Sequence, residues 1–91
     1  MAHVYLVSHQ KCVVGIFSNR TWMIGSIGKL FENCHIKGQR KNLAVTASSI
    51  GVNMPNGFIE LYDNDTDEIE FRIWDLNINS VNPQYKERIL K

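Results

Sequence analysis

Residues 69–78 read Ile69-Glu70-Phe71-Arg72-Ile73-Trp74-Asp75-Leu76-Asn77-Ile78, and this stretch decides the fold class. Apolar and polar side chains alternate through Ile73, which is the period of a half-buried β-strand. The alternation then slips by one residue at Trp74 and Asp75, and we interpret the slip as a β-bulge. A second strand-like run covers residues 58–62, and the polar stretch 63–67 separates the two. Together they predict a β-hairpin over 58–79.

The N-terminal part predicts another hairpin, over residues 3–17. Segments 3–8 and 12–17 are rich in β-branched and aromatic residues, and a short polar break separates them. Both segments are apolar on both faces, so we expect them to be central strands covered on at least one side by a helix. Gly15, inside the second segment, indicates a bulge or a close approach of the backbone.

After Ser18, which is a good helix N-cap, the apolar period changes from two to three or four residues. This spacing predicts an amphipathic helix over about 19–33. Its apolar stripe consists of Met23, Ile24, Ile27, Leu30, Phe31 and Cys34. Gly25 and Gly28 each disfavour a helix by about 1 kcal/mol, and we expect them to let the helix lie close to the sheet.

Residues 43–52 fit a short helix or a strand, and we favour a helix over 41–51. Residues 53–57 are a predicted loop, and the tail 83–91 is predicted to form a short helical turn. A chain of 91 residues is one domain. The predicted fold is therefore α+β: a small antiparallel sheet from two hairpins, about 3–17 and 58–79, packed against one or two helices.

The net charge is only +1, but the charges are segregated along the chain. The first half carries most of the cations, and residues 47–82 carry most of the acids. Such a chain can fold into a two-sided dipole with a basic face. Alternatively, the two halves neutralise each other across the fold, and this is the reading we favour.

No catalytic or metal-binding motif is complete. Asp63-Asn64-Asp65-Thr66-Asp67 begins like a calcium loop, but Glu68 stands where the loop needs glycine and Trp74 where it needs glutamate. The three histidines and two cysteines lack the spacing of zinc ligands. The adjacent Cys34 and His35 lack a third group that would orient the base. We therefore expect no enzyme activity, no metal and no cofactor.

Cys12 and Cys34 are the only cysteines, and no secretory signal precedes them. We therefore expect a cytoplasmic protein in which both thiols are free and buried. No apolar run approaches the roughly 18 residues that cross a bilayer, so no membrane contact is expected.

Three segments carry a resemblance to a known class of proteins: Val4-Tyr-Leu-Val7, Val13-Val-Gly-Ile-Phe-Ser18 with the helix after it, and Phe71-Arg-Ile-Trp-Asp-Leu76. The chain resembles small uncharacterised phage-encoded accessory proteins over residues 3–34 and 58–79. The resemblance implies a protein of the host cytoplasm that binds and inhibits a host factor, often a defence system. Some such proteins bind nucleic acid, and no functional residue is carried over.

Two functions follow as hypotheses. The first is binding to a host protein through an acidic, aromatic surface in the last hairpin, where charge steers encounter. Its residues are Glu60, Asp63, Asp65, Asp67, Glu68, Glu70 and Trp74. The second is RNA or DNA binding, because Lys and Arg neutralise phosphates. Its residues are the basic segment Lys37, Arg40 and Lys41 with Lys11, Arg20 and Lys29. A homodimer is compatible with both.

Overall fold

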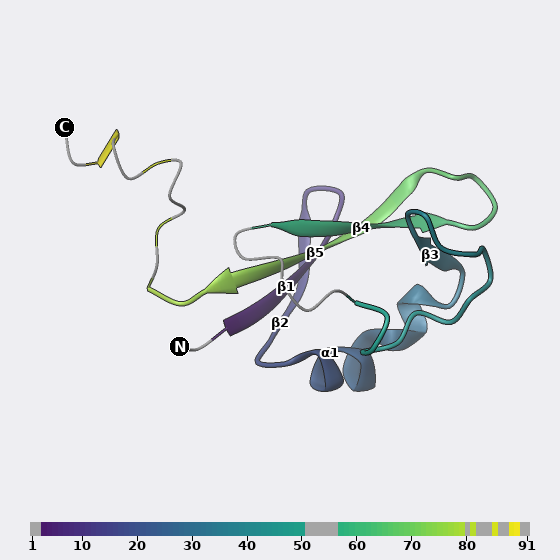
Figure 1. Ribbon diagram of the computed structural model, residues 1–91, viewed down its shortest axis with the longest axis horizontal. Coiled ribbons are helices and arrows are strands. Elements are labelled where there is room, and N and C mark those ends of the chain that lie inside the picture. Colours follow the sequence, from purple (N-terminus) through teal and green to yellow (C-terminus); the bar gives the residue numbers. More distant parts are fainter. Residues whose placement is uncertain (1–2, 51–56, 80, 82–84, 86–87, 90–91) are drawn as a thin grey trace.

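The structure is a computed structural model, and it describes residues 3–50, 57–79, 81, 85, 88 and 89. Five strands form one antiparallel sheet in the order β2-β1-β5-β4-β3. Their bounds are His3–His9 for β1, Cys12–Phe17 for β2, Cys34–Ile36 for β3, Phe58–Asp63 for β4 and Ile69–Asn77 for β5. The helical segment that packs against the sheet consists of the α-helix α1 (Arg20–Ile27) and the 3-10 turn η1 (Gly28–Phe31). The α+β class is therefore confirmed (Figure 1).

The core lies between the helical segment and one face of the sheet, which we call the covered face. Figure 1 shows α1 on this one side of the strands. Side chains alternate along a strand, so every second residue of the central strands enters the core. The buried apolar side chains are Tyr5, Val7, Cys34, Leu61, Phe71 and Ile73 from the strands, Met23 and Phe31 from the helical segment, and Ile50 from the connector.

Strand β5 keeps its alternation at the place where a bulge was predicted. The pairing of β1 with β5 runs without interruption past Trp74 and Asp75. Asp75 takes the inward position that follows Ile73, and it is only 3% exposed. The predicted bulge is therefore wrong, because a carboxylate occupies a core position and makes the pattern look shifted. The register shift of β5 lies nearer its start, where it faces Leu61 and Tyr62 of β4.

The hairpin of β1 and β2 carries the irregularity that Gly15 indicated. Val7 pairs with Gly15, but its neighbour Ser8 pairs with Val13, so Val14 is an extra residue in β2. A Cβ atom built on Gly15 would come within 2.8 Å of the Phe17 ring. Glycine thus lets that ring lie across the strand, and the predicted close approach is confirmed.

The predicted helix is present but shorter and differently ended. Asn19, not Ser18, is its N-cap, because the Asn19 side chain accepts a 2.8 Å hydrogen bond from the Trp22 amide. The α-helix ends at Ile27 and continues as the tighter η1. The change of winding buries Phe31 and leaves Leu30 48% exposed, so Leu30 leaves the predicted apolar stripe.

The glycines of the helix do not serve close packing on the sheet. A Cβ atom on Gly25 would meet no heavy atom within 4 Å, and one on Gly28 would meet only the side chain of Ile24. That prediction is wrong. Gly28 instead lies at the C-cap of α1, where the α-helix gives way to the 3-10 turn.

The connector between β3 and β4 differs from the prediction in two ways. Cys34–Ile36 form a strand rather than the end of a helix and the start of a loop. Residues 41–50 are turns and irregular chain, so a helix over this part of 41–51 is wrong. The reason is local: the Ser49 hydroxyl accepts from the Thr46 amide and donates to the Thr46 carbonyl. Such side-chain bonds compete with helical ones.

Part of the prediction lies outside the described residues. This applies to the loop 53–57 except Gly57, to the end of the 41–51 segment, and to the tail 83–91 except Tyr85, Arg88 and Ile89. In the described part of the chain, no helix has the length and apolar content needed to cross a bilayer.

Candidate interaction surfaces

The face of the sheet opposite the helical segment, which we call the open face, carries a row of apolar side chains. Strand register places Ile16 of β2 next to Leu6 of β1, Leu6 next to Trp74 of β5, and Trp74 next to Phe58 of β4. Ile16 is 60% exposed, Phe58 is 44% exposed, and Leu6 and Trp74 are partly exposed. Four adjacent strands thus present one continuous apolar row. An apolar surface of this extent on a small domain indicates a site of interaction.

The aromatic end of this row is ordered by contacts among its own members. The rings of Phe58 and Trp74 have their centroids 4.5 Å apart with an interplanar angle of 42°. The guanidinium carbon of Arg72 lies 5.5 Å from the centre of the Phe58 ring, and Arg72 Nε lies 3.2 Å from a carboxylate oxygen of Glu60. The Trp74 indole N–H donates a 3.3 Å hydrogen bond to Ser8. Aromatic and arginine side chains held in this way lose little conformational entropy when a partner binds.

The acidic stretch 63–67 is the turn between β4 and β5, and it is built on Asp63. One Asp63 carboxylate oxygen accepts from the amides of Asp65 and Thr66 at 2.8 and 3.0 Å. These amides, with Thr66 the stronger, lower the pKa of Asp63 because they stabilise its charged form. The Asn33 side chain donates to Asp65 at 2.8 Å. These acids therefore shape the turn.

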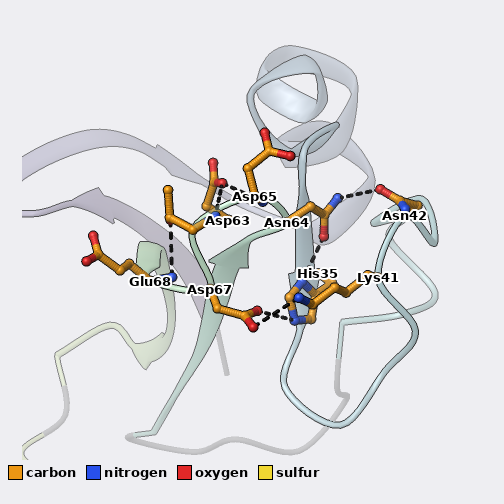
Figure 2. Close-up of polar contacts among 9 residues, drawn as sticks. His35, Lys41, Asn42, Asp63, Asn64, Asp65, Asp67 and Glu68 are labelled. Atoms are coloured by element: carbon orange, nitrogen blue, oxygen red, sulfur yellow. Dashed lines mark hydrogen bonds and ion pairs between the residues drawn. The ribbon is translucent and has the colours of Figure 1, made fainter.

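The same turn lies against the connector that follows β3 (Figure 2). His35 Nδ1 lies 2.8 Å from the Asn64 side-chain oxygen, so this nitrogen carries the proton and donates it. Lys41 donates to Asp67 at 3.0 Å, and Asn64 donates to Asn42 at 3.2 Å. Acidic and basic segments that are distant in sequence thus neutralise each other here. At this contact the structure agrees with the favoured interpretation, in which the basic and acidic parts of the chain neutralise each other across the fold.

Asn64→Ala is expected to lower the free energy of unfolding by about 1–3 kcal/mol, because it leaves a buried His35 N–H without its acceptor. Urea unfolding followed by circular dichroism measures the change. Glu68→Ala, at an exposed position of the same turn, is the control and is expected to cost less than about 0.5 kcal/mol. Equal losses in the two variants would contradict the assigned role of Asn64.

The structure separates the seven residues of the predicted protein-binding surface. Trp74 and Glu60 lie on the open face, next to Phe58 and Arg72 respectively. The three aspartates and Glu68 lie in the turn. Glu70 pairs with His9 at 3.3 Å, beside the ring of Phe71 on the covered face. The members of the row other than Trp74 were not predicted as site residues.

The six residues of the predicted nucleic-acid surface are also dispersed. Arg20 donates to the backbone carbonyls of Ile50 and Ala47 at 2.6 and 3.3 Å, so it holds the connector against α1. Lys41 is paired with Asp67. The exposed Lys11 lies at the β1–β2 turn, Lys29 on η1, and Lys37 and Arg40 after β3. Because β2 and β3 are opposite edges of the sheet, these cations do not gather at one strand edge.

The two cysteines are free, as expected, but only one is buried. Cys12 is exposed at the start of β2, which corrects the prediction that both are inside. Burial, together with the nearby charges of Glu70 and Asp63, raises the pKa of the Cys34 thiol to about 11. Cys34 is therefore a structural thiol, not an activated nucleophile.

At neutral pH we expect a thiol reagent to modify Cys12 quickly and Cys34 only after unfolding. Because the pKa of Cys34 is raised from 9.0 to about 11 on folding, its contribution to stability is present below pH 9 and is lost as pH rises toward 11. Urea midpoints measured across this pH range test the loss of stability with rising pH, and Cys34→Ala should make that loss smaller. Rapid labelling of both thiols in the native protein would contradict the assignment.

The buried Asp75 is not among the predicted site residues. A carboxylate oxygen of the buried Asp75 lies 3.0 Å from Nδ1 of His3, whose side chain is about half exposed. A buried carboxylate needs such a partner, because an unpaired charge in the core is costly. His3 thus anchors the start of β1 to the end of β5. Within the described residues, no cluster of histidine, cysteine and acidic side chains is arranged to hold a metal ion.

The fold and its surfaces define a small α+β domain whose five-stranded antiparallel sheet is covered by helix on one face and presents an apolar, aromatic row on the other. No protein-family model, curated protein or solved structure matches the chain.

Proposed function

We propose that this chain is a non-catalytic accessory protein of the phage type, which binds a host protein through the open face of its sheet and blocks that protein's action. The observation that supports the proposal most is the row Ile16–Leu6–Trp74–Phe58, which spans four strands. Inhibition by occlusion needs a stable, preformed contact surface and no chemistry. A sheet face has both a rigid backbone and side chains in fixed register.

The composition of the open face sets the chemistry of the partner. Trp74 and Arg72 are of the residue types that most often dominate the energy of protein interfaces, and Phe58 is of a type that is enriched there. Glu60 lies beside Arg72, so the face offers one charge of each sign next to the apolar row. The partner we propose is therefore a host protein with an apolar patch flanked by an acid and a base. The aspartates of the β4–β5 turn then have a structural role.

The size of the open face sets how much of an interface it can supply. Adjacent strands lie about 4.8 Å apart and residues rise about 3.4 Å along a strand, so five strands and six residues outline about 24 by 20 Å. A standard interface buries about 800 Å² on each side. This outline is at most about 480 Å², because β3 has only three residues, so the open face supplies part of one side of such an interface.

The experiment is affinity capture from host lysate with the tagged full-length chain, in parallel with Trp74→Ala and Trp22→Ala. Trp22, on α1, is 67% exposed and lies on the other side of the sheet, so it is the matched control. We expect a stoichiometric host protein with the parent and with Trp22→Ala, and its loss with Trp74→Ala. Capture that depends on Trp22 alone would place the site on the helix and contradict the proposal.

The second candidate is binding of single-stranded RNA or DNA, and one observation favours it. Phe58 and Trp74 on a sheet face, with Arg72 beside them, are also suited to stacking of unpaired bases. The same capture decides between the two when it is repeated with nuclease and at high salt. Protein binding through an apolar row survives both treatments, whereas phosphate binding weakens steeply with salt. Loss of binding in Arg40→Ala, Lys41→Ala would assign the site to the basic connector.

A further inference from the structure

Strand β2 is the edge of the sheet that carries the most exposed apolar surface. Within the described residues it has a neighbouring strand, β1, on one side only, so β2 is an edge strand and the prediction that it is central is wrong. Its sequence, Cys12 to Phe17, contains no charge and no proline. Proteins commonly protect a free edge with lysine, proline, a β-bulge or a very short strand, because unpaired N–H and C=O groups recruit another strand. Of these features β2 has only the bulge at Val14. The opposite edge, β3, has that protection because it is only three residues long.

The bulge at Val14 gives this edge an unusual side-chain pattern. Val13 pairs with Ser8 and Ile16 with Leu6, and both of these partners belong to the open face. The extra residue thus turns Val13 and Ile16 to the same face, and each is 60% exposed. On the covered side an open apolar hollow of about 360 Å³ runs beside the strand, lined by His9, Cys12, Val14, Leu30 and Phe71. Apolar surface therefore flanks the free edge on both faces.

We propose that β2 pairs antiparallel with β2 of a second copy of this chain, which joins two sheets into one of ten strands. A strand edge that pairs antiparallel with itself is related by a two-fold axis, so one surface supplies both halves of the contact. The net charge of +1 adds almost no repulsion between copies. The inference goes beyond the proposed function, because it concerns self-association and does not depend on the host partner.

A two-fold axis between Val14 and Gly15 gives a definite register. It sets Val13 against Ile16 of the second copy, so the four exposed side chains become two apolar cross-strand pairs on the open face. It also sets Cys12 against Phe17 of the second copy, next to the hollow on the covered side. The pairing therefore gives hydrogen-bond partners to the free backbone groups of β2 and buries the exposed apolar surface on both faces of the strand. The open faces of the two copies become continuous, which doubles the apolar row.

Sedimentation velocity over a wide concentration range tests the dimer. A particle of twice 10.5 kDa is expected for the parent. The double variant Val13→Lys, Ile16→Lys should be monomeric, because it places charges at the edge where the two copies meet. Leu43→Lys, at a similarly exposed apolar position in the connector, is the control and should remain dimeric. Circular dichroism confirms that each variant is folded.

Disulfide trapping tests the register, with Cys12→Ser as the background. Val13→Cys and Ile16→Cys are made as separate variants and oxidised alone and as a mixture. The proposed register predicts a covalent dimer in the mixture and little in either variant alone. A parent that is monomeric at all concentrations, or a dimer that survives the lysine pair, overturns the inference. A dimer that dissociates only when Phe58 is changed to alanine would indicate face-to-face packing and also overturn it.

The two proposals fail separately. If the parent protein is monomeric, capture of a host protein through Trp74 can still be measured with that monomer. Absence of a host partner leaves the sedimentation result unchanged.

Discussion

Trp74→Ala is expected to weaken capture of the host partner about 30-fold or more, which corresponds to about 2 kcal/mol of binding free energy. Trp74 is an inner member of the four-residue apolar row, with Leu6 on one side and Phe58 on the other. Its indole packs at 4.5 Å from the Phe58 ring and is oriented by Ser8. Central aromatic residues that are already oriented contribute most to binding, because they bury a large area at little cost in entropy.

Affinity is best measured by titration of the captured partner against the purified variants. Phe58→Ala should also weaken binding. The losses of binding free energy in the two single variants should not add up in the double variant, because the two rings touch. Trp22→Ala and Leu30→Ala remove apolar side chains of the helical side that are more exposed than Trp74, and each should change affinity less than about threefold. Unchanged affinity in Trp74→Ala, with the fold intact, would exclude the open face.

Phe31→Ala is expected to lower the free energy of unfolding by about 3–5 kcal/mol. Phe31 is fully buried and its ring meets Phe71 of β5 edge-on, with centroids 5.3 Å apart. Removal of this ring leaves a cavity between η1 and the covered face. The free energy of unfolding of a small domain is about 5–15 kcal/mol in total, so the variant should be close to unfolding at room temperature.

Urea unfolding followed by circular dichroism gives the loss, and labelling of Cys34 gives an independent readout. Native Phe31→Ala should label at Cys34 much faster than the parent, because the thiol reacts from the open state. Leu30→Ala is the matched control: this neighbour on η1 is exposed and should cost less than about 1 kcal/mol. A similar loss of unfolding free energy in both variants would contradict the arrangement in which η1 buries Phe31 and leaves Leu30 exposed.

Much of the local structure could be predicted from periodicity. The alternation in 69–73 and the β-branched runs of the N-terminal half indicated strands, and the three-to-four spacing after Ser18 indicated a helix. The errors arise where the local pattern has two explanations. Asp75 looked like a register slip because a buried acid breaks the apolar period without breaking the strand. Residues 41–50 looked helical, but the Thr46–Ser49 bonds close a turn instead.

The candidate site was predictable only in part. Trp74 was predicted as a site residue, but the other members of the row can be identified only when the order of the strands is known. Leu6 and Ile16 come from the N-terminal hairpin, and Trp74 and Phe58 from the last one. The alternating pattern of residues 69–73 shows that this strand has two different faces, although the N-terminal strands are apolar on both faces. It does not show that β1 and β5 pair, which is what aligns the four side chains.

The amino-acid sequence by itself determined the α+β class, most of the strands and the approximate place of the helix, because these depend on backbone propensity and on side-chain period within a few residues. Only the tertiary structure decided which face of the sheet the helix covers, which charges neutralise each other, and that Asp75 is buried against His3. Those properties depend on contacts between segments far apart in the chain, and such contacts are set by packing of the whole core.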